Sequence, residues 1–294
     1  MSNDASAWEF LGVTLRRIRP LTARRICRNE GKLLFMIREL FDLTGKTALI
    51  TGGSRGLGFD IARGAAELGA RVILLARSKD QLSKSLASID APSDRKAAIS
   101  ADLADLNAIP DLVERAVREV GPIDILVNNA GINWVAPAES FPKDQWLRVI
   151  DVNLNAPFLL AKEIARACMI PRKCGCILNI ASIGGLIGNP PQLHMSIAPY
   201  NASKGGLISL TRALASEWGH YGINVNALCP GFFITDMSRE FLEGVGNTVL
   251  PTVPLGRFGG QRDLVGPALL LISAAGRHIT GETIVVDGGM TSAS

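Results

Sequence analysis

The chain of 294 residues has few of the residues that hold metals or form disulfides: five cysteines and three histidines. The cysteine number is odd, and Cys174-Gly-Cys176 has no partner motif with the spacing of zinc ligands. We therefore expect free thiols, as in a reducing compartment such as the cytoplasm, and no structural or catalytic metal.

Long hydrophobic runs are also absent. The longest apolar stretches, such as 33–37 and 268–275, fall far short of the roughly 18 residues that a membrane span needs. The sequence therefore predicts no transmembrane segment. It contains no internal repeat either, which excludes solenoids and propellers.

Most of the chain has no excess of charge of one sign. The sequence has 31 basic and 27 acidic residues, but eight basic and four acidic ones lie in 1–40, which leaves 23 of each in 41–294. A neutral body gives no support for binding nucleic acid. We therefore expect no nucleic-acid partner and treat 1–40 as a basic N-terminal extension, separate from a domain over 41–294.

Leucine and isoleucine are interleaved with arginine in this extension, which predicts a helical and partly amphipathic segment. Three interpretations compete. We favour an arm that packs on the domain or on a neighbouring subunit. A membrane-surface or organelle-targeting helix is disfavoured by the early acids Asp4 and Glu9. The third interpretation is a translation start at Met36.

Short apolar runs alternate with helical patterns through 41–294, without a linker rich in proline, glycine or serine. Continuous apolar strands between helices are typical of a parallel sheet that is covered on both faces. The sequence therefore predicts a single doubly wound α/β domain. Its candidate strands are Lys46–Thr51, Arg71–Ala76, Lys96–Ser100, Ile123–Val127, Gly175–Ala181, Ile223–Leu228 and Thr283–Val286.

The first strand runs into the turn Gly52-Gly-Ser-Arg-Gly-Leu-Gly58 and then into an apolar helical pattern. A strand, a glycine turn and a helix in this order form the first unit of a dinucleotide-binding fold, because glycines let the backbone approach a pyrophosphate. The spacing here is Gly-x-x-x-Gly-x-Gly. An ordinary tight strand-to-helix connection is the alternative.

Tyr200 and Lys204 lie four residues apart, just after Pro199, which suits the start of a helix. In a helix both side chains project from one face, so the ammonium group can lie beside the phenol. A tyrosine has a pKa of about 10 and needs a nearby positive charge to transfer protons at neutral pH. A solvated surface pair is the alternative.

Together with other motifs, the turn and the pair make 41–290 similar to the short-chain dehydrogenase/reductase superfamily. In chain order the motifs are Thr51–Gly58, Asp102-Leu103, Asn128-Asn-Ala-Gly131, Asn153, Ser182, Tyr200-x-x-x-Lys204, Pro230-Gly231 with Thr235, and Asp287-Gly-Gly289. The resemblance implies a Rossmann-type domain with a mainly parallel, seven-stranded sheet. It also implies hydride exchange between a nicotinamide and a substrate carbon.

The resemblance implies a catalytic role for four residues. Tyr200 transfers the proton to or from the carbonyl oxygen, and Lys204 lowers the pKa of the phenol and binds the nicotinamide ribose. Ser182 donates a hydrogen bond to the developing alkoxide, and Asn153 holds a water that links Lys204 to solvent. Lowering the pKa of Tyr200 towards 7 needs roughly 4 kcal/mol, more than one exposed ion pair supplies, so we expect the nicotinamide charge and partial burial to contribute.

Cofactor-binding positions follow from the same resemblance and from charge. They are Gly52, Ser54, Arg55, Gly56, Leu57, Gly58, Arg77, Asp102, Leu103, Asn129, Ala130, Gly131, Tyr200, Lys204, Pro230, Gly231 and Thr235. By resemblance Asp102 binds the adenine amine and Thr235 the nicotinamide carboxamide. The alternative for Asp102 is to cap a helix that begins near Leu106.

Charge also predicts which cofactor binds. A fold that selects NAD usually has an acid at the end of the second strand, which binds the ribose 2′-hydroxyl. That strand ends here without an acid at Ala76-Arg77, and Arg55 lies in the glycine turn. Two guanidinium groups can bind a 2′-phosphate, so we expect NADP(H) ahead of NAD(H). Solvated surface arginines are the alternative.

The stretch between Ser182 and Tyr200 is longer than in many members of the superfamily and is similar to that of gluconate 5-dehydrogenase-like enzymes. We expect a ketone and a secondary alcohol to be interconverted on a small polar substrate such as a keto-sugar acid. The alternatives are 3-oxoacyl thioester reduction and a non-catalytic NADP(H)-binding sensor or scaffold. Gln192 and His194 contact polyol hydroxyls or cap a turn.

Two further expectations concern apolar residues. Those that follow Gly231, among them Met237, form either a substrate lid or a helix packed on the core. Long helices are predicted near 144–168 and 200–218, and Leu207, Leu210 and Leu214 form a stripe on the second. An exposed stripe favours association, so we expect a homo-oligomer, a tetramer.

Overall fold

The computed structural model describes residues 37–189, 193, 195–235 and 238–293. Leu40–Ser294 form a compact unit. The predictions for residues 1–36 of the extension, among them Cys27, and those for Gln192, His194 and Met237 lie outside the described residues, whereas 37–40 are helical as predicted. No helix within the described ranges is long and apolar enough to cross a membrane.

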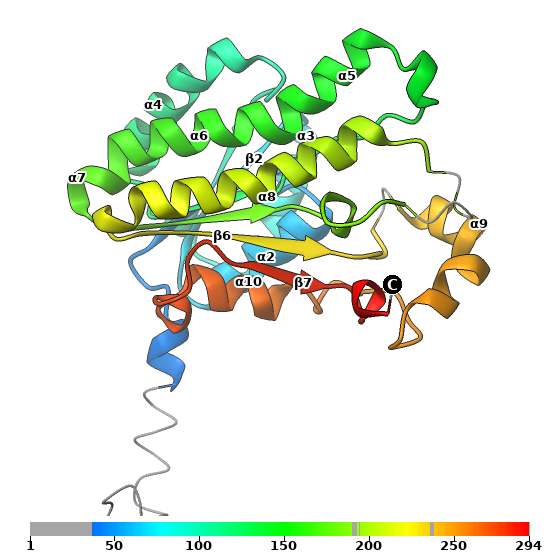
Figure 1. Ribbon diagram of the computed structural model, residues 1–294. Coiled ribbons are helices and arrows are strands. Elements are labelled where there is room, and N and C mark those ends of the chain that lie inside the picture. Colours follow the sequence, from blue (N-terminus) through cyan, green and yellow to red (C-terminus); the bar gives the residue numbers. More distant parts are fainter. Residues whose placement is uncertain (1–36, 190–192, 194, 236–237, 294) are drawn as a thin grey trace, which may run out of the picture. The chain divides into compact units, whose positions relative to one another are not determined.

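The centre of the unit is a sheet of seven parallel strands in the order β3-β2-β1-β4-β5-β6-β7 (Figure 1). The strands are β1 Thr47–Thr51, β2 Arg71–Ala76, β3 Lys96–Ser100, β4 Ile125–Asn128, β5 Gly175–Ile180, β6 Ile223–Pro230 and β7 Thr283–Val286. All of them lie within one or two residues of the predicted bounds. The predicted α/β class and the seven-stranded Rossmann-type sheet are confirmed.

Helices cover both faces of this sheet (Figure 1). Their bounds are α2 Gly56–Glu67, α3 Lys79–Ser88, α4 Ile109–Val120, α5 Lys143–Ile150, α6 Ala156–Ile164, α7 Ile170–Arg172, α8 Ala198–Trp218, α9 Arg239–Val249 and α10 Val265–Ile272. α4, α6 and α8 pack on one face, and α2 and α10 on the other. Successive strand residues point to opposite faces, so Leu49 belongs to the first core cluster and its neighbours Ala48 and Ile50 to the second.

The strand order reverses between β1 and β4, and this places the site. From β1 the chain builds outward through β2 and β3, then returns to β4 on the other side of β1. The connections that leave the carboxyl ends of β1 and β4 therefore diverge, and a crevice opens between them. The glycine turn Gly52–Gly58 follows β1, and Asn129 to Gly131 follow β4.

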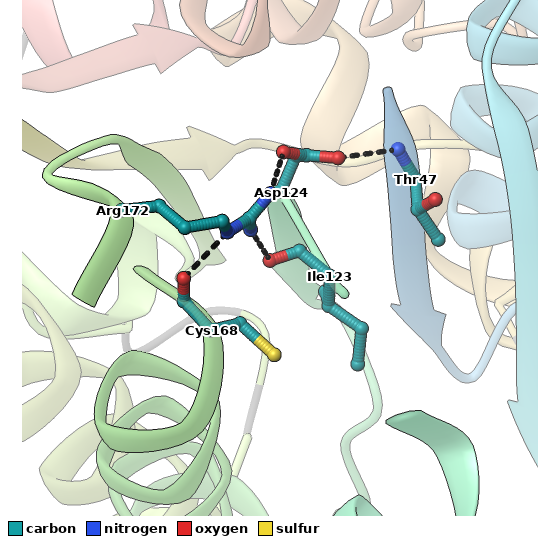
Figure 2. Close-up of polar contacts among 5 residues, drawn as sticks. All are labelled: Thr47, Ile123, Asp124, Cys168 and Arg172. Atoms are coloured by element: carbon teal, nitrogen blue, oxygen red, sulfur yellow. Dashed lines mark hydrogen bonds and ion pairs between the residues drawn. The ribbon is translucent and has the colours of Figure 1, made fainter. Parts of the chain in front are cut away.

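The opposite, amino-terminal edge of the sheet is closed by a partly buried ion pair (Figure 2). The Asp124 carboxylate accepts hydrogen bonds from the Thr47 backbone N–H at 2.9 Å and from the Arg172 guanidinium at 2.8 Å. The same guanidinium donates to the carbonyl oxygens of Cys168 at 2.7 Å and Ile123 at 2.9 Å. One arginine at the end of the α6–α7 segment thus ties that segment to β1 and β4, and the charge of Asp124 is compensated.

The helix predicted near 144–168 is present, but it is not a regular α-helix. α5, α6 and α7 follow one another through two π-helical segments, Asp151–Asn155 and Ala165–Met169. A π-helical turn is wider than an α-helical one and re-aims the side chains that it carries. Asn153 lies in the first segment, so the irregularity falls at a predicted site residue.

The prediction of an exposed leucine stripe on α8 is wrong. Leu207 and Leu214 are buried in the same chain, and Leu210 packs partly against the same core, because this face of α8 lies over β5 and β6. Exposed apolar side chains occur instead on the neighbouring helices. They are Trp146 and Leu147 on α5 and Phe158 on α6.

Candidate functional site

A cavity of about 740 Å³ opens at the carboxyl ends of the strands. All but two of the predicted site residues line it, the exceptions being Gly58 and Asn153. Lining residues that the sequence analysis missed include Ser78, Gln81, Asn133, Arg148, Val152, Phe233 and Ser238. They come from the start of α3, the segment after β4, α5 with the π-helical segment that follows it, and the segment after β6, and no motif marks them in the sequence.

The glycine turn is held against the end of β4 by Thr51 and Asn129. The Thr51 hydroxyl accepts hydrogen bonds from the N–H groups of Asn129 and Ala130, both at 2.9 Å, and the Asn129 amide donates to the Thr51 carbonyl at 2.9 Å. A Cβ atom on Gly58 would lie 2.2 Å from the Asn129 amide nitrogen, and one on Gly52 would lie 2.9 Å from it. Gly58 therefore lets the turn close against Asn129, although it does not face the cavity.

The turn suits an anionic, phosphate-bearing ligand. It ends at the N-terminus of α2, where backbone N–H groups and the helix dipole favour negative charge. Gly56 has a φ of +56° and only the Thr235 side chain near the position of a Cβ atom, so ligand atoms can approach the backbone closely. The residues present therefore fit a dinucleotide.

Arg55 lies in the glycine turn directly before α2, and Arg77 lies between β2 and α3. Both are exposed and line the cavity, and neither guanidinium has a hydrogen-bond or ion-pair partner in the described part of the chain. The Ser85 hydroxyl on α3 donates to the Ser54 carbonyl at 2.6 Å and so connects α3 with the glycine turn. The two arginines are thus held on connected segments, with their charges free to bind a ligand.

Asp102 also lines the cavity and is exposed. Its carboxylate accepts a hydrogen bond from the Ala104 N–H at 3.1 Å. The alternative in which it caps the following helix is wrong, because Asp105 takes that place and accepts from the Ala108 N–H at 3.3 Å. Asp105 lies three residues before the N–H that it caps, the usual separation for a side-chain cap.

Tyr200, Lys204 and Ser182 are brought together where β5 ends against α8. Pro199 lies in the first turn of α8, as predicted, and the Lys204 ammonium lies 5.6 Å from the centre of the Tyr200 ring. Lys204 is buried and donates to the Ile180 carbonyl at 2.7 Å. Ser182 follows β5, and its hydroxyl accepts from the Gly184 N–H at 3.1 Å.

Burial has opposite consequences for the two titratable side chains. It raises the pKa of Tyr200 above its ordinary value, and a hydrogen bond from Ser182 lowers it in part. It lowers the pKa of Lys204 to about 8. The expectation that partial burial helps to lower the pKa of the phenol is therefore wrong, because removal from water disfavours the phenolate.

Asn153 is fully buried behind Gly131. Its side-chain oxygen accepts from the Ile132 N–H at 2.8 Å, and its amide donates to the Ile132 carbonyl at 2.9 Å and to the Ser203 hydroxyl at 3.1 Å. The Ser203 hydroxyl in turn donates to the Tyr200 carbonyl at 2.7 Å. Asn153 thus connects the segment after β4 to the first turn of α8.

The segment after β6 forms another wall of the cavity. Pro230, Gly231, Phe233 and Thr235 line it, and a Cβ atom on Gly231 would lie 2.7 Å from the Cβ of Asp287. The apolar residues that follow form α9, in which Leu242 is buried. The helix packed on the core is thus observed at Leu242, whereas Phe241 on the same helix is exposed and Phe233 lines the cavity. The substrate lid stays a prediction.

The longer stretch before Tyr200 is anchored at three described positions. The Asn189 amide donates to the Met195 carbonyl at 3.1 Å, and the Ser196 carbonyl accepts from the Ala136 N–H at 3.0 Å. Leu193 is buried against Val249 and Val253. This stretch therefore packs on α9 and contacts the segment after β4.

Metal ligands do not group in the part of the chain that the structure describes, where no three His, Cys, Asp or Glu side chains come together. The four described cysteines, Cys168, Cys174, Cys176 and Cys229, are free thiols. The absence of a metal from the protein stays a prediction.

Gly185 tests how closely the Ser182 turn packs on α8. A Cβ atom there would lie 2.6 Å from the backbone carbonyl carbon of Lys204, which cannot move without shifting α8. We predict that Gly185→Ala lowers the free energy of unfolding by about 1–3 kcal/mol. Gly188→Ala in the same loop is the control, because nothing lies within 4 Å of its Cβ position. Denaturant unfolding measures both, and equal stabilities for the two variants would contradict the packing.

Known proteins are similar to this chain in sequence and in fold. The sequence profile described as short chain dehydrogenase matches residues 46–245. Gluconate 5-dehydrogenase from Gluconobacter oxydans is 38% identical over 255 residues, which cover 86% of this chain and 97% of that protein. A 3-oxoacyl-[acyl-carrier-protein] reductase from Staphylococcus epidermidis is 37% identical over 246 residues, which cover 83% and 98%.

Solved structures agree with this relationship. The crystal structure of a gluconate 5-dehydrogenase from Burkholderia cenocepacia, in complex with NADP and tartrate, matches with a TM-score of 0.81 and 36% identity, covering 88% of this chain and 100% of that one. The residues that the sequence profile matches include the glycine turn, the end of β5 and α8, which carries Tyr200 and Lys204. The chain is therefore an oxidoreductase that belongs to the short-chain dehydrogenase family.

Proposed function

We propose that this protein interconverts a ketone and a secondary alcohol on a keto-sugar acid, with NADP(H) as the hydride carrier. The observation that carries the proposal is the meeting of Tyr200, Lys204 and Ser182 in the wall of a cavity whose other end holds the glycine turn. A ligand that fills this cavity reaches from the N-terminus of α2 to the Tyr200 phenol. Bound there, NADP(H) donates or accepts the hydride.

The side chains of this protein manage the proton. In the reductive direction the Tyr200 hydroxyl gives its proton to the carbonyl oxygen, and the Ser182 hydroxyl donates a hydrogen bond to the same oxygen as negative charge develops there. The Lys204 ammonium stabilises the resulting phenolate and binds the nicotinamide ribose. Asn153 acts behind Gly131, where it holds the segment after β4 against α8 and keeps a water beside Lys204.

Arg55 and Arg77 support the choice of NADP(H). Both line the cavity and have no partners in the described residues, and β2 ends at Ala76-Arg77 without an acid. Several structural neighbours were solved with NADP bound, among them the enzyme from Burkholderia cenocepacia. The other proposed cofactor contacts are Gly52, Ser54, Gly56 and Leu57 in the glycine turn, Asp102 and Leu103 at the adenine, Asn129 to Gly131, and Pro230, Gly231 and Thr235 at the nicotinamide.

The substrate class rests on relatives and on the loop before Tyr200. Relatives named gluconate 5-dehydrogenase and 5-keto-D-gluconate 5-reductase match 86% of the chain, and tartrate, a small hydroxy acid, is bound in one neighbour. The similar identity to a 3-oxoacyl-[acyl-carrier-protein] reductase keeps thioester reduction as the second candidate. A non-catalytic sensor is disfavoured, because such a protein has no use for the complete set of Asn153, Ser182, Tyr200 and Lys204.

Assembly and location complete the proposal. We propose a homotetramer, supported by the exposed Trp146, Leu147 and Phe158 on adjoining helices. We also propose a domain that begins near Phe41, after a separate extension. Free thiols at every described cysteine support a cytoplasmic location. Light scattering tests the homotetramer, and a stable monomer would contradict it. Cell fractionation tests the cytoplasmic location.

Replacement of Tyr200 tests the chemistry. With 5-keto-D-gluconate and NADPH, we predict that Tyr200→Phe lowers kcat at least about a hundredfold, because the transferable proton is lost, and leaves NADPH binding nearly unchanged. Lys204→Ala should lower kcat and also weaken NADPH binding. The control is Tyr221→Phe, which changes the only other tyrosine and should keep full activity. Substantial turnover by Tyr200→Phe would end the mechanism, and faster reduction of a 3-oxoacyl thioester by the wild type would favour the second candidate.

Replacement of Arg77 tests the cofactor. We predict that Arg77→Ala weakens NADPH binding by about tenfold or more, because a charge-assisted hydrogen bond to the 2′-phosphate is lost, and that it leaves NADH binding unchanged. Arg115→Ala on α4, an exposed arginine outside the cavity, is the matched control. Titration calorimetry measures the four affinities. If the wild type binds NADH as tightly as NADPH, the two arginines do not select the cofactor.

A further inference from the structure

Ser238 makes an unusual set of contacts for a serine that no motif marks. Its hydroxyl donates to the Phe233 carbonyl at 2.5 Å and accepts from the Thr235 N–H at 3.0 Å. It also lies 3.0 Å from the Thr235 hydroxyl, and the Ser238 N–H donates to that hydroxyl at 3.3 Å. Ser238 lines the cavity beside Thr235.

These contacts decide which hydroxyl donates. A serine hydroxyl has one proton and two lone pairs. The Ser238 hydroxyl is much closer to the Phe233 carbonyl, at 2.5 Å, than to its other carbonyl acceptor, that of Thr235 at 3.4 Å, so we assign its proton to Phe233. In the contact between the two hydroxyls Thr235 is then the donor. The Thr235 hydroxyl keeps at least one lone pair, because the Ser238 N–H is shared between this hydroxyl at 3.3 Å and the Thr235 carbonyl at 3.1 Å. Towards the cavity it can only accept a hydrogen bond.

The backbone around Thr235 is fixed independently of Ser238. Gly259 donates to the Phe232 carbonyl at 2.9 Å and accepts from the Ile234 N–H at 3.0 Å. A Cβ atom on Gly259 would lie 2.7 Å from the Phe233 ring, so only glycine allows this approach. Because Gly259 holds this segment in addition to Ser238, we expect the segment to keep its path when Ser238 is changed. The groups that Ser238 then controls are the Thr235 N–H and hydroxyl.

The base of this arrangement is α9. The Ser238 carbonyl accepts from the Leu242 N–H at 2.8 Å, and Leu242 is buried. At the other end of α9, Val249 is buried against Leu193 of the long stretch before Tyr200. Ser238 is therefore held by a helix that packs at both ends.

We propose that Ser238 is a positioning residue that forces the Thr235 hydroxyl to act as a hydrogen-bond acceptor towards the nicotinamide, and so selects a carboxamide N–H₂ group. The inference rests on the proposed function, in which Thr235 meets the nicotinamide end of NADP(H). A carboxamide can donate to that lone pair. A ketone or ester group at the same ring position has no proton to donate and leaves the acceptor unpaired.

The test compares NADP⁺ with its 3-acetylpyridine analogue, in which a methyl ketone replaces the carboxamide. We expect the wild type to bind NADP⁺ about tenfold more tightly than the analogue, the cost of one unpaired acceptor. Ser238→Ala frees the Thr235 proton, which can then turn to the ketone, so the ratio of the two dissociation constants should fall to about two. Ser238→Thr keeps a hydroxyl and should keep the ratio. Ser209→Ala, at an exposed serine on α8, is the matched control.

Two further measurements separate positioning from general damage. Adenosine 2′,5′-bisphosphate carries only the adenine half of the cofactor, so its affinity should be the same in Ser238→Ala and the wild type. Thr235→Val by itself should abolish the difference in affinity between NADP⁺ and the analogue. Adding Ser238→Ala to Thr235→Val should then have no further effect, because Ser238 acts through Thr235. If Ser238→Ala does not fold, Ser238→Thr and Thr235→Val carry the test.

The outcomes are distinguishable. An unchanged ratio in Ser238→Ala, or an equal loss of affinity for adenosine 2′,5′-bisphosphate, overturns the role of Ser238 and leaves the proposed function intact. Discrimination that survives in Thr235→Val overturns it as well, since the acceptor would then lie elsewhere. A wild type that binds neither NADP⁺ nor NADPH overturns the proposed function, and the inference with it.

Discussion

The site depends on one buried positive charge. Lys204 is almost fully buried, no carboxylate pairs with it among the described residues, and its ammonium group donates to the Ile180 carbonyl at the end of β5. Removing this charge from water is costly, and burial lowers the pKa of Lys204 to about 8. At neutral pH the group still carries most of its charge. The fold thus fixes a cation beside the Tyr200 ring by holding α8 against the end of β5.

Contacts at both edges of the sheet hold the surrounding elements in place. At the amino-terminal edge, Asp124 and Arg172 join the strands to the α6–α7 segment (Figure 2). At the carboxyl edge, Thr51 and Asn129 join the glycine turn to β4, and Gly185 lets the Ser182 turn rest on the α8 backbone. The two ends of the cavity therefore belong to one rigid sheet. A ligand that spans it meets groups whose separation is set by strand spacing.

Much of this could be predicted from the sequence, because strand patterns and short-range motifs are local. β2, β3 and β7 have the predicted bounds, and the four-residue spacing of Tyr200 and Lys204 placed both on one face of α8. What depends on tertiary packing could not be predicted. The burial of Leu207 and Leu214 is decided by strands that are distant in sequence. The π-helical turn at Asn153 and the use of Asp105 as the cap instead of Asp102 depend on a local geometry that no motif specifies. The same holds for the contacts of Ser238.

Tyr200 presents the remaining physical problem, because the protein alone raises the pKa of the group that we propose as the proton donor and acceptor. In the proposed mechanism, the positive charge of the oxidised nicotinamide ring lowers this pKa together with the charge of Lys204. Carbon-13 labelling of the tyrosine Cζ atoms tests this directly, since the chain has only two tyrosines and Tyr200→Phe assigns the signals. We predict that Tyr200 titrates above its ordinary pKa of about 10 in the free protein and well below it with NADP⁺ bound. A low pKa in the free protein, or one that NADP⁺ leaves unchanged, would contradict this account.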